Sequence, residues 1–403
     1  MDRNRQGGGR ARPPAELTAR GGFSLAELLV AMAAALLLVA SLLAVAGSGQ
    51  VAMRAQAATI DLDQRLRAVS EAVSADLASA GSGPTTGVCG RALGVVAPAI
   101  LPFCLGPRGD PPGTARADAV TIVTALPHAA AVGLAASFVP SVGLAQVAMS
   151  PGCPVADASC GVRLGDVVML LDGGGQADLF DVALVTGADI QLTPRGATSG
   201  RTFGPGAWLV PVSVASYYYA AETTIDDAQL IAGNGGTSEL PFVDHVTGVE
   251  VRLFGDPRPP ALGSPGVPPG RATYGPTPPP PGVDDPRDAW PAGENCAFLV
   301  QDGVQRSRLA TLGGGAGLVA LSPELLTDGP WCPDADAPNR VDADLFRVRE
   351  VRVTVRIEAA SPAVRGTDSR LFSHPGVARN PLAWVPDRQV TVDVVPRALQ
   401  VGR

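Results

Sequence analysis

The chain of 403 residues contains no lysine, and all 31 of its basic residues are arginine. A phosphate-binding loop that ends in Gly-Lys and a Schiff-base lysine are therefore excluded. There are only three histidines, His128, His245 and His374, and no Gly-x-Ser-x-Gly, His-Glu-x-x-His or Cys-x-x-Cys motif occurs. We therefore expect a protein that is not an enzyme and that has neither a cofactor nor a motif-bound metal.

Charged residues are also scarce, at 17%, whereas hydrophobic residues make up 46%. The net charge is −7, and no concentrated basic segment marks a nucleic-acid site, although a local arginine patch could still bind DNA. Two groups of aspartates are candidate calcium ligands. Neither group has the spacing of an EF-hand loop, and calcium binding by either group stays open. These groups are Asp172, Asp178 and Asp181 and, further on, Asp334, Asp336, Asp342 and Asp344.

Neither proline nor charge interrupts a long segment near the N-terminus. No proline occurs between Phe23 and Gly83, and no charged residue occurs from Leu28 to Met53. As a helix, this uncharged run is long enough to span a bilayer core of about 30 Å. The arginines of residues 1–22 favour a cytoplasmic start. We therefore expect a single-pass inner-membrane protein with a periplasmic C-terminal domain.

After Met53 the pattern becomes amphipathic. Apolar residues recur at spacings of mainly three and four, with charged residues between them, at Ile60, Leu62, Leu66, Val69, Val73 and Leu77. This spacing predicts a helical stripe that packs against another part of the protein. Gly81-Ser82-Gly83-Pro84 is a stop signal, so we predict one helix over residues 23–80.

The junction between the basic segment and the apolar run reads Gly22-Phe23-Ser24-Leu25-Ala26-Glu27. This pattern resembles the N-terminus of type IV prepilins. The resemblance implies that residues 1–22 are a leader, that a prepilin peptidase cuts between Gly22 and Phe23, and that the new amine of Phe23 is methylated. It also implies that Glu27 pairs with the N-terminal amine of a neighbouring subunit during filament assembly.

Other interpretations of this segment stay open. A secretory signal would be cut after a small-residue site such as Ala44-Val45-Ala46, and a plain signal anchor would not be cut at all. Glu27 could also reach the membrane interface without a partner, because a carboxylate inside lipid is paired, protonated or drawn to the surface.

The six cysteines all lie in the part of the chain that we expect to be exported, at Cys89, Cys104, Cys153, Cys160, Cys296 and Cys332. An even number confined to this region indicates disulfides formed in an oxidising compartment. The sequence does not fix the connectivity. Our prediction is that each cysteine pairs with its nearest neighbour, in the order 89–104, 153–160 and 296–332.

Residues 81–403 contain short apolar segments separated by turn residues, which indicates strands. The predicted strands are 119–124, 165–171, 177–185, 189–192, 208–219, 242–254, 346–357 and 389–395. The second to fourth of these are separated by short turns and predict a meander. Segment 346–357 alternates apolar residues with arginine, so we expect it to pair with 389–395 and to hold its arginines in solvent. His245 lies within a predicted strand, so we expect it to be a structural residue and not a catalytic base.

The expected fold class is α+β: a pilin-like long N-terminal helix, half in the membrane and half amphipathic, packed on an antiparallel β-rich globular domain with long loops. The domain, residues 81–403, includes a proline-rich loop over 255–293, which is too rich in proline for a core strand. The order of the strands resembles the large minor pilins called PilW-like and, more loosely, minor pseudopilins of type II secretion.

The resemblance implies a structural function, that of a minor pilin or pseudopilin that primes or caps assembly of a type IV pilus or a type II secretion pseudopilus. The implied partners are the prepilin peptidase, other major and minor pilins or pseudopilins, and inner-membrane lipid. After assembly the protein would lie in the filament. Two other functions stay open: a filament-carried adhesin or DNA-capture subunit, and a membrane-anchored enzyme whose site is assembled in space.

Overall fold

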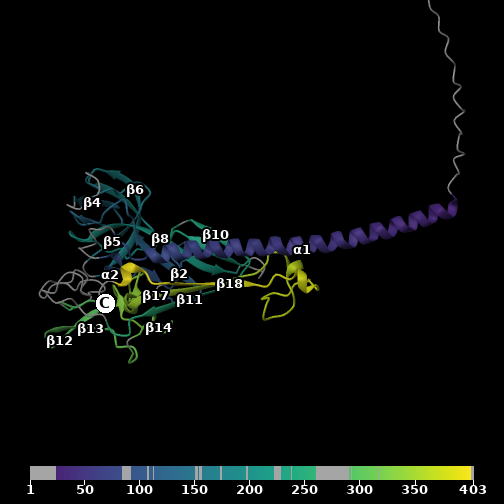
Figure 1. The fold of residues 1–403 in the computed structure, drawn as a ribbon. Coiled ribbons are helices and arrows are strands. Elements are labelled where there is room, and N and C mark those ends of the chain that lie inside the picture. Colours follow the sequence, from purple (N-terminus) through teal and green to yellow (C-terminus); the bar gives the residue numbers. More distant parts are fainter. Residues whose placement is uncertain are drawn as a thin grey trace, which may run out of the picture. The chain divides into compact units, whose positions relative to one another are not determined.

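A computed structural model describes residues 24–83, 92–106, 109–111, 113–149, 153, 157–172, 175–196, 198–221, 228–236, 238–259, 290–291, 293–315 and 317–400, apart from the side chain of Ser48. Gly22, Phe23, Cys89 and residues 260–289 of the proline-rich segment lie outside them. The chain divides into two compact units, Met1–Ala55 and Gln56–Arg403. The described residues form an α+β protein with one long N-terminal helix and an antiparallel β-rich part (Figure 1).

Helix α1 covers Leu25–Ser79, close to the predicted range. The chain leaves the helix through Gly81, whose φ of +68° is a left-handed conformation that glycine adopts without steric cost. A Cβ atom at Gly81 would also lie 3.0 Å from a methyl carbon of Leu399. The Gly81 N–H donates to the carbonyl of Val123 at 2.9 Å, which ties the end of the helix to the β-rich unit.

Ten strands form the larger sheet. Their bounds are β1 (Ile100–Leu101), β2 (Ala119–Ala125), β3 (Val132–Leu134), β4 (Leu144–Ala148), β5 (Val167–Leu171), β6 (Ala177–Thr186), β7 (Asp189–Pro194), β8 (Trp208–Ala220), β9 (Gln229–Gly233) and β10 (Glu239–Asp244). All of their pairings are antiparallel, and β5–β6–β7 is the predicted meander. Six strands close into a ring, because β8 pairs with β3, the order continues through β4, β7, β6 and β5, and β5 pairs again with β8.

The interior of this barrel is filled by alternate residues of its strands, as the two-residue period of a strand requires. Each strand contributes to one buried cluster, which includes Val132, Ala145, Val168, Phe180, Ile190 and Leu209. Phe138 adds an aromatic ring whose centroid lies 5.2 Å from that of Phe180 in an edge-on arrangement. The barrel is therefore a packed core and not a channel.

Strand β8 connects the barrel to the rest of the sheet. From Val212 onward it pairs with β2, and from Ser216 onward it also pairs with β9 on its other side. Strands β1 and β10 extend the sheet by pairing with β2 and β9. The short helix α2 (Leu93–Val96) precedes β1.

A second sheet has four antiparallel strands in the order β14-β11-β17-β18. Their bounds are β14 (Val319–Leu321), β11 (Val246–Gly255), β17 (Val348–Ile357) and β18 (Arg388–Val394). The predicted pairing of the last two is confirmed, with Val353 opposite Val392. Valine and isoleucine alternate along β17 with residues that are only half-buried.

Two hairpins complete the strands: β12 (Phe298–Gln301) with β13 (Val304–Ser307), and β15 (Trp331–Cys332) with β16 (Val341–Asp342). The 3-10 helices are η2 (Ala343–Arg347), η3 (Pro362–Val364), η4 (Pro381–Ala383) and η5 (Arg397–Gln400). Residues 358–387, which connect β17 to β18 and include η3 and η4, are named the β17–β18 lobe.

Two expectations about the strands are wrong. Segment 242–254 is split between β10 and β11, because His245 takes a φ of +54° and turns the chain. Its Nδ1 atom is buried and has no hydrogen-bond partner among the described residues. Arg347 lies in η2 and is fully buried, because Asp344 and the carbonyls of Pro257 and Ala310 accept hydrogen bonds from its guanidinium.

Candidate functional site

The first turn of α1 is closed by a reciprocal pair of hydrogen bonds between Ser24 and Glu27. The backbone N–H of Ser24 donates to Oε2 of Glu27 at 3.0 Å, and the backbone N–H of Glu27 donates to Oγ of Ser24 at 3.2 Å. This is a capping box, in which each side chain satisfies a backbone donor that has no partner within the helix. The Glu27 carboxylate is thereby held at the positive end of the helix dipole.

Apolar side chains that follow Glu27 are exposed in the isolated chain. The most apolar window of α1 has a mean hydropathy of 2.8, and none of it is buried. Leu37, for example, is 73% exposed. Such a surface requires apolar surroundings. Among the described residues, α1 is the one helix that is long and apolar enough to cross a membrane, which is consistent with single-pass anchoring.

The second half of α1 buries an apolar stripe in the β-rich unit. Leu62, Val69, Val73 and Leu77 are at most 1% exposed, and Leu66 is 9% exposed. Ile60 was expected to belong to this stripe, but it is 57% exposed. The predicted stripe is therefore confirmed from Leu62 onward, and it holds this half of the helix in the fold.

Polar contacts from the same half of α1 reach both sheets. The Tyr217 hydroxyl on β8 donates to Oδ2 of Asp76 at 2.7 Å. On the second sheet, Nη1 of Arg388 donates to Oδ1 of Asp63 at 2.7 Å. Burial, helped by the bond to Asp76 and its charge, raises the pKa of Tyr217, so this hydroxyl stays a donor at neutral pH.

The cysteines form two of the three predicted disulfides, Cys153–Cys160 and Cys296–Cys332. Cys104 was expected to pair with Cys89, which lies outside the described residues, but Cys104 is a free, buried thiol. Burial, followed by the nearby Asp110 and Glu239 carboxylates, raises the pKa of this thiol to about 12. A thiol of this kind is chemically inert near neutral pH.

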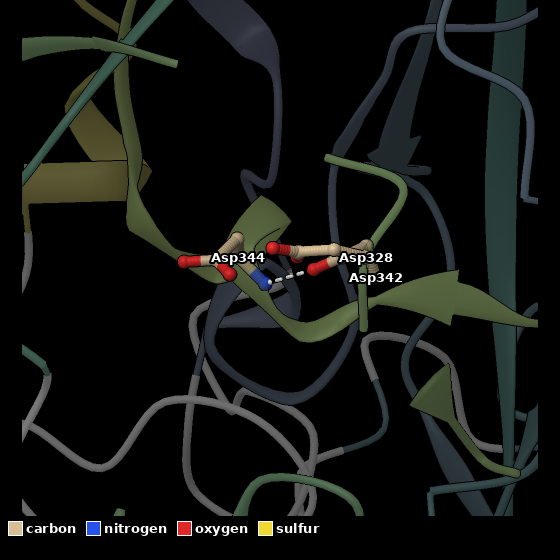
Figure 2. Close-up of side chains that lie close together, drawn as sticks. All are labelled: Asp328, Asp342 and Asp344. Atoms are coloured by element: carbon tan, nitrogen blue, oxygen red, sulfur yellow. Dashed lines mark hydrogen bonds between the residues drawn. The ribbon is translucent and has the colours of Figure 1, made fainter. Parts of the chain in front are cut away.

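Three aspartates, Asp328, Asp342 and Asp344, each place one carboxylate oxygen within 4.8 Å of the other two. Figure 2 shows the three side chains close together. Asp342 caps η2 by accepting from the Asp344 N–H at 2.8 Å, and it also accepts from the Gly329 N–H at 2.7 Å. Asp344 pairs with the buried Arg347. Burial raises the pKa of Asp342 to about 7, and the charges of Asp344 and Asp328 contribute. Asp342 and Asp344 therefore accept hydrogen bonds from the chain's own donors, and Asp342 caps η2.

Of the aspartates that the sequence offered for calcium, Asp342 and Asp344 belong to this cluster, whereas three others pair with different partners among the described residues. Asp334 pairs with Arg201 at 3.0 Å, whereas Asp342 and Asp344 have other partners. In the other group, Asp178 accepts hydrogen bonds from Ser199 and Asn339, and Asp181 pairs with Arg195. Each of these carboxylates connects two segments of the fold.

A cavity of about 730 Å³ lies in the β-rich unit. Its wall is largely apolar and includes Phe103, Met169, Leu179 and Phe346, with the Cys104 thiol among the lining atoms. The Asp181–Arg195 pair lies at the same wall, joined at 2.5 Å. Asp110 and Arg340 also line the cavity, so its apolar wall carries four charged side chains.

No protein-family model, no curated protein and no solved structure matches the chain. The resemblance carried by Gly22, Phe23 and Glu27 therefore stays a prediction. Ser24 is the residue of this region whose role the sequence reasoning missed. The signal was present, since a serine three residues before a glutamate at the head of an apolar run is the pattern of a capping box.

Proposed function

We propose that the chain is a minor pilin or pseudopilin, a structural subunit that a prepilin peptidase cuts between Gly22 and Phe23. One observation carries the proposal: the Glu27 carboxylate is fixed at the start of an exposed apolar helix, four residues after the proposed new amine of Phe23. The cut removes the basic leader, so the helix then begins with one amine and one carboxylate.

The different surroundings of the two halves of α1 support this proposal. The first half of α1 offers mainly apolar side chains to its surroundings, whereas the second half is fixed to the β-rich unit by its stripe and by Asp76 and Asp63. A neighbouring helix in a filament can cover the first half. The size of the β-rich unit, Gln56–Arg403, favours a place at or near the tip, where it does not crowd a repeating lattice.

Glu27 has two candidate roles, as a helix cap and as the charge partner in assembly, and the experiment has to distinguish them. Glutamine at this position keeps the capping box but removes the charge that would pair with an amine. Alanine at Ser24 weakens the capping box but keeps the charge. The two variants therefore distinguish a helix cap from a charge partner.

The test compares Glu27→Gln and Ser24→Ala in the host, with cleavage of each chain verified by intact mass. We expect cut Glu27→Gln chains to be missing from the isolated filament fraction, while Ser24→Ala chains are incorporated. The opposite result, incorporation of Glu27→Gln and loss of Ser24→Ala, would mean that Glu27 acts as a cap, and it would contradict the assembly role.

A further inference from the structure

The β17–β18 lobe is a long connection with its own packed interior. The ring of Phe372 meets that of Trp384 edge-on at 6.1 Å, and Nε1 of Trp384 donates to the Ala378 carbonyl at 3.0 Å. Val364 and Val385 are also buried, and the Val385 N–H donates to the Val364 carbonyl at 2.8 Å. Long connections that keep such internal order are often functional.

Acidic groups at the two ends of the lobe are turned inward. The Glu358 side chain is 1% exposed and binds Arg365 at 2.9 Å and His374 at 2.8 Å. The Asp387 side chain is 0% exposed and pairs with Arg356 at 3.1 Å. These carboxylates are neutralised inside the protein, so they contribute little to the charge of the lobe surface.

The exposed side chains of the lobe include three large apolar residues and two arginines. Leu382 is 86% exposed, Val377 is 72% exposed and Leu371 is 45% exposed. Two arginines, Arg370 and Arg379, are exposed among them. The Arg370 side chain is 89% exposed, although it lies 3.4 Å from Asp368. This combination contrasts with the net charge of −7 for the whole chain.

The lobe is attached to the part of α1 that directly follows the membrane-spanning run. Arg388, the residue after the lobe, binds Asp63, and Nη2 of Arg65 lies 3.5 Å from the Glu358 carbonyl. Asp61 follows Met53, the last residue of the uncharged run, by about 12 Å of helix at 1.5 Å per residue. The attachment therefore lies close, along the helix, to the end of the spanning segment.

We propose that the β17–β18 lobe binds the anionic lipid surface of the membrane in which α1 is anchored. Leu371, Val377 and Leu382 enter the interfacial region, and Arg370 and Arg379 contact the anionic headgroups. The contact holds the β-rich unit against the bilayer before assembly. This inference rests on the membrane-anchored state that is part of the proposed function.

The test places a nitroxide label on the full-length chain in vesicles of phosphatidylethanolamine and phosphatidylglycerol. The label is carried by Leu382→Cys in the lobe, by Leu37→Cys in the spanning half of α1, or by Leu184→Cys, which is 57% exposed on barrel strand β6. The unsubstituted chain, treated in the same way, supplies the background from its own cysteines. A high collision rate of the label with oxygen indicates a lipid environment, and a high rate with a water-soluble nickel chelate indicates exposure to water.

We expect the nickel collision rate at Leu382 to be several-fold lower than at Leu184, and the oxygen rate to be higher. The difference should shrink in vesicles of phosphatidylcholine alone and in the Arg370→Gln, Arg379→Gln double variant. A label at Leu382 in water while that at Leu37 is in lipid would overturn the lobe contact and leave anchoring intact. A Leu37 label in water would instead refute the anchoring itself.

Two further results would also overturn the lobe contact. Equal protection of the labels at Leu382 and Leu184 would mean unspecific adsorption. Dipolar broadening at Leu382 that disappears when labelled chains are diluted with unlabelled ones would mean that a second copy of the chain, and not lipid, covers the lobe.

Discussion

Tyr217 on β8 donates its hydroxyl to the Asp76 carboxylate on α1 at 2.7 Å, across 141 residues of sequence. A hydrogen bond to a charged group contributes about 1.5–3 kcal/mol. Tyr217→Phe should therefore lower the free energy of unfolding of the β-rich unit by about 2 kcal/mol, measured by urea denaturation of the detergent-solubilised full-length chain.

Asp76→Asn supplies the control for this pair. The amide keeps an oxygen that accepts from Tyr217, so only the contribution of the charge is lost, and the destabilisation should be smaller than for Tyr217→Phe. Equal stability of Tyr217→Phe and the unsubstituted chain would show that this bond does not fix the helix.

The apolar stripe of α1 gives a second prediction, for which the chain offers its own control. Leu62 is fully buried, whereas Ile60, two residues away, is 57% exposed. Leu62→Ala should cost about 2–5 kcal/mol through lost burial and the cavity left behind, while Ile60→Ala should change the free energy of unfolding by less than about 0.5 kcal/mol. Similar costs for the two, measured by urea denaturation, would contradict the register of the helix.

The two disulfides should differ in their effect on stability, because they close loops of different length. Cys296 and Cys332 are separated by 36 positions, and Cys153 and Cys160 by 7. Loop-closure entropy predicts a loss of about 4 kcal/mol when the first bond is replaced by two serines and about 2 kcal/mol for the second. Thermal unfolding of the two double variants checks the order, and a larger loss for the shorter loop would contradict it.

The raised pKa of Asp342 predicts that stability falls with rising pH. Its folded-state pKa of about 7 lies above the ordinary value of 3.8. The unfolded state therefore loses its proton first, and stability declines from about pH 4 until the folded carboxyl has ionised near pH 7, by about 1.4 kcal/mol per unit of pKa difference. Thermal unfolding across this range measures the slope.

Asp328→Asn is the matched variant for that slope. It removes a like charge beside Asp342 and leaves both of the backbone bonds that Asp342 accepts. The pKa of Asp342 should then move toward its ordinary value, and the decline in stability should become shallower. An unchanged slope would mean that other groups cause it.

The sequence predicted local elements well, because period and turn chemistry act over short distances. The α1 stripe from Leu62 onward, the β5–β6–β7 meander and the β17–β18 pairing followed from spacing alone. The closure of the barrel did not, since the pairing of β5 with β8 depends on residues about 40 apart in the sequence and leaves no periodic signal.

The predictions for two single residues were wrong for local reasons. His245 sits in an apolar run that reads as one strand, yet its φ of +54° breaks that run. Arg347 belongs to an alternating pattern, but Asp344 and backbone carbonyls pair with it inside the protein. A pattern of hydrophobicity does not reveal partners that are brought together only in the folded chain. The capping box at Ser24 could have been predicted directly from the sequence.

The central claim is that this chain enters a filament system through cleavage after Gly22. N-terminal sequencing and intact mass of the membrane-extracted protein, from hosts with and without the prepilin peptidase, test it most directly. We expect a mature chain that starts at methylated Phe23 and that is missing without the peptidase. A chain that starts after Ala46, or one that keeps Met1 in both hosts, would contradict the claim.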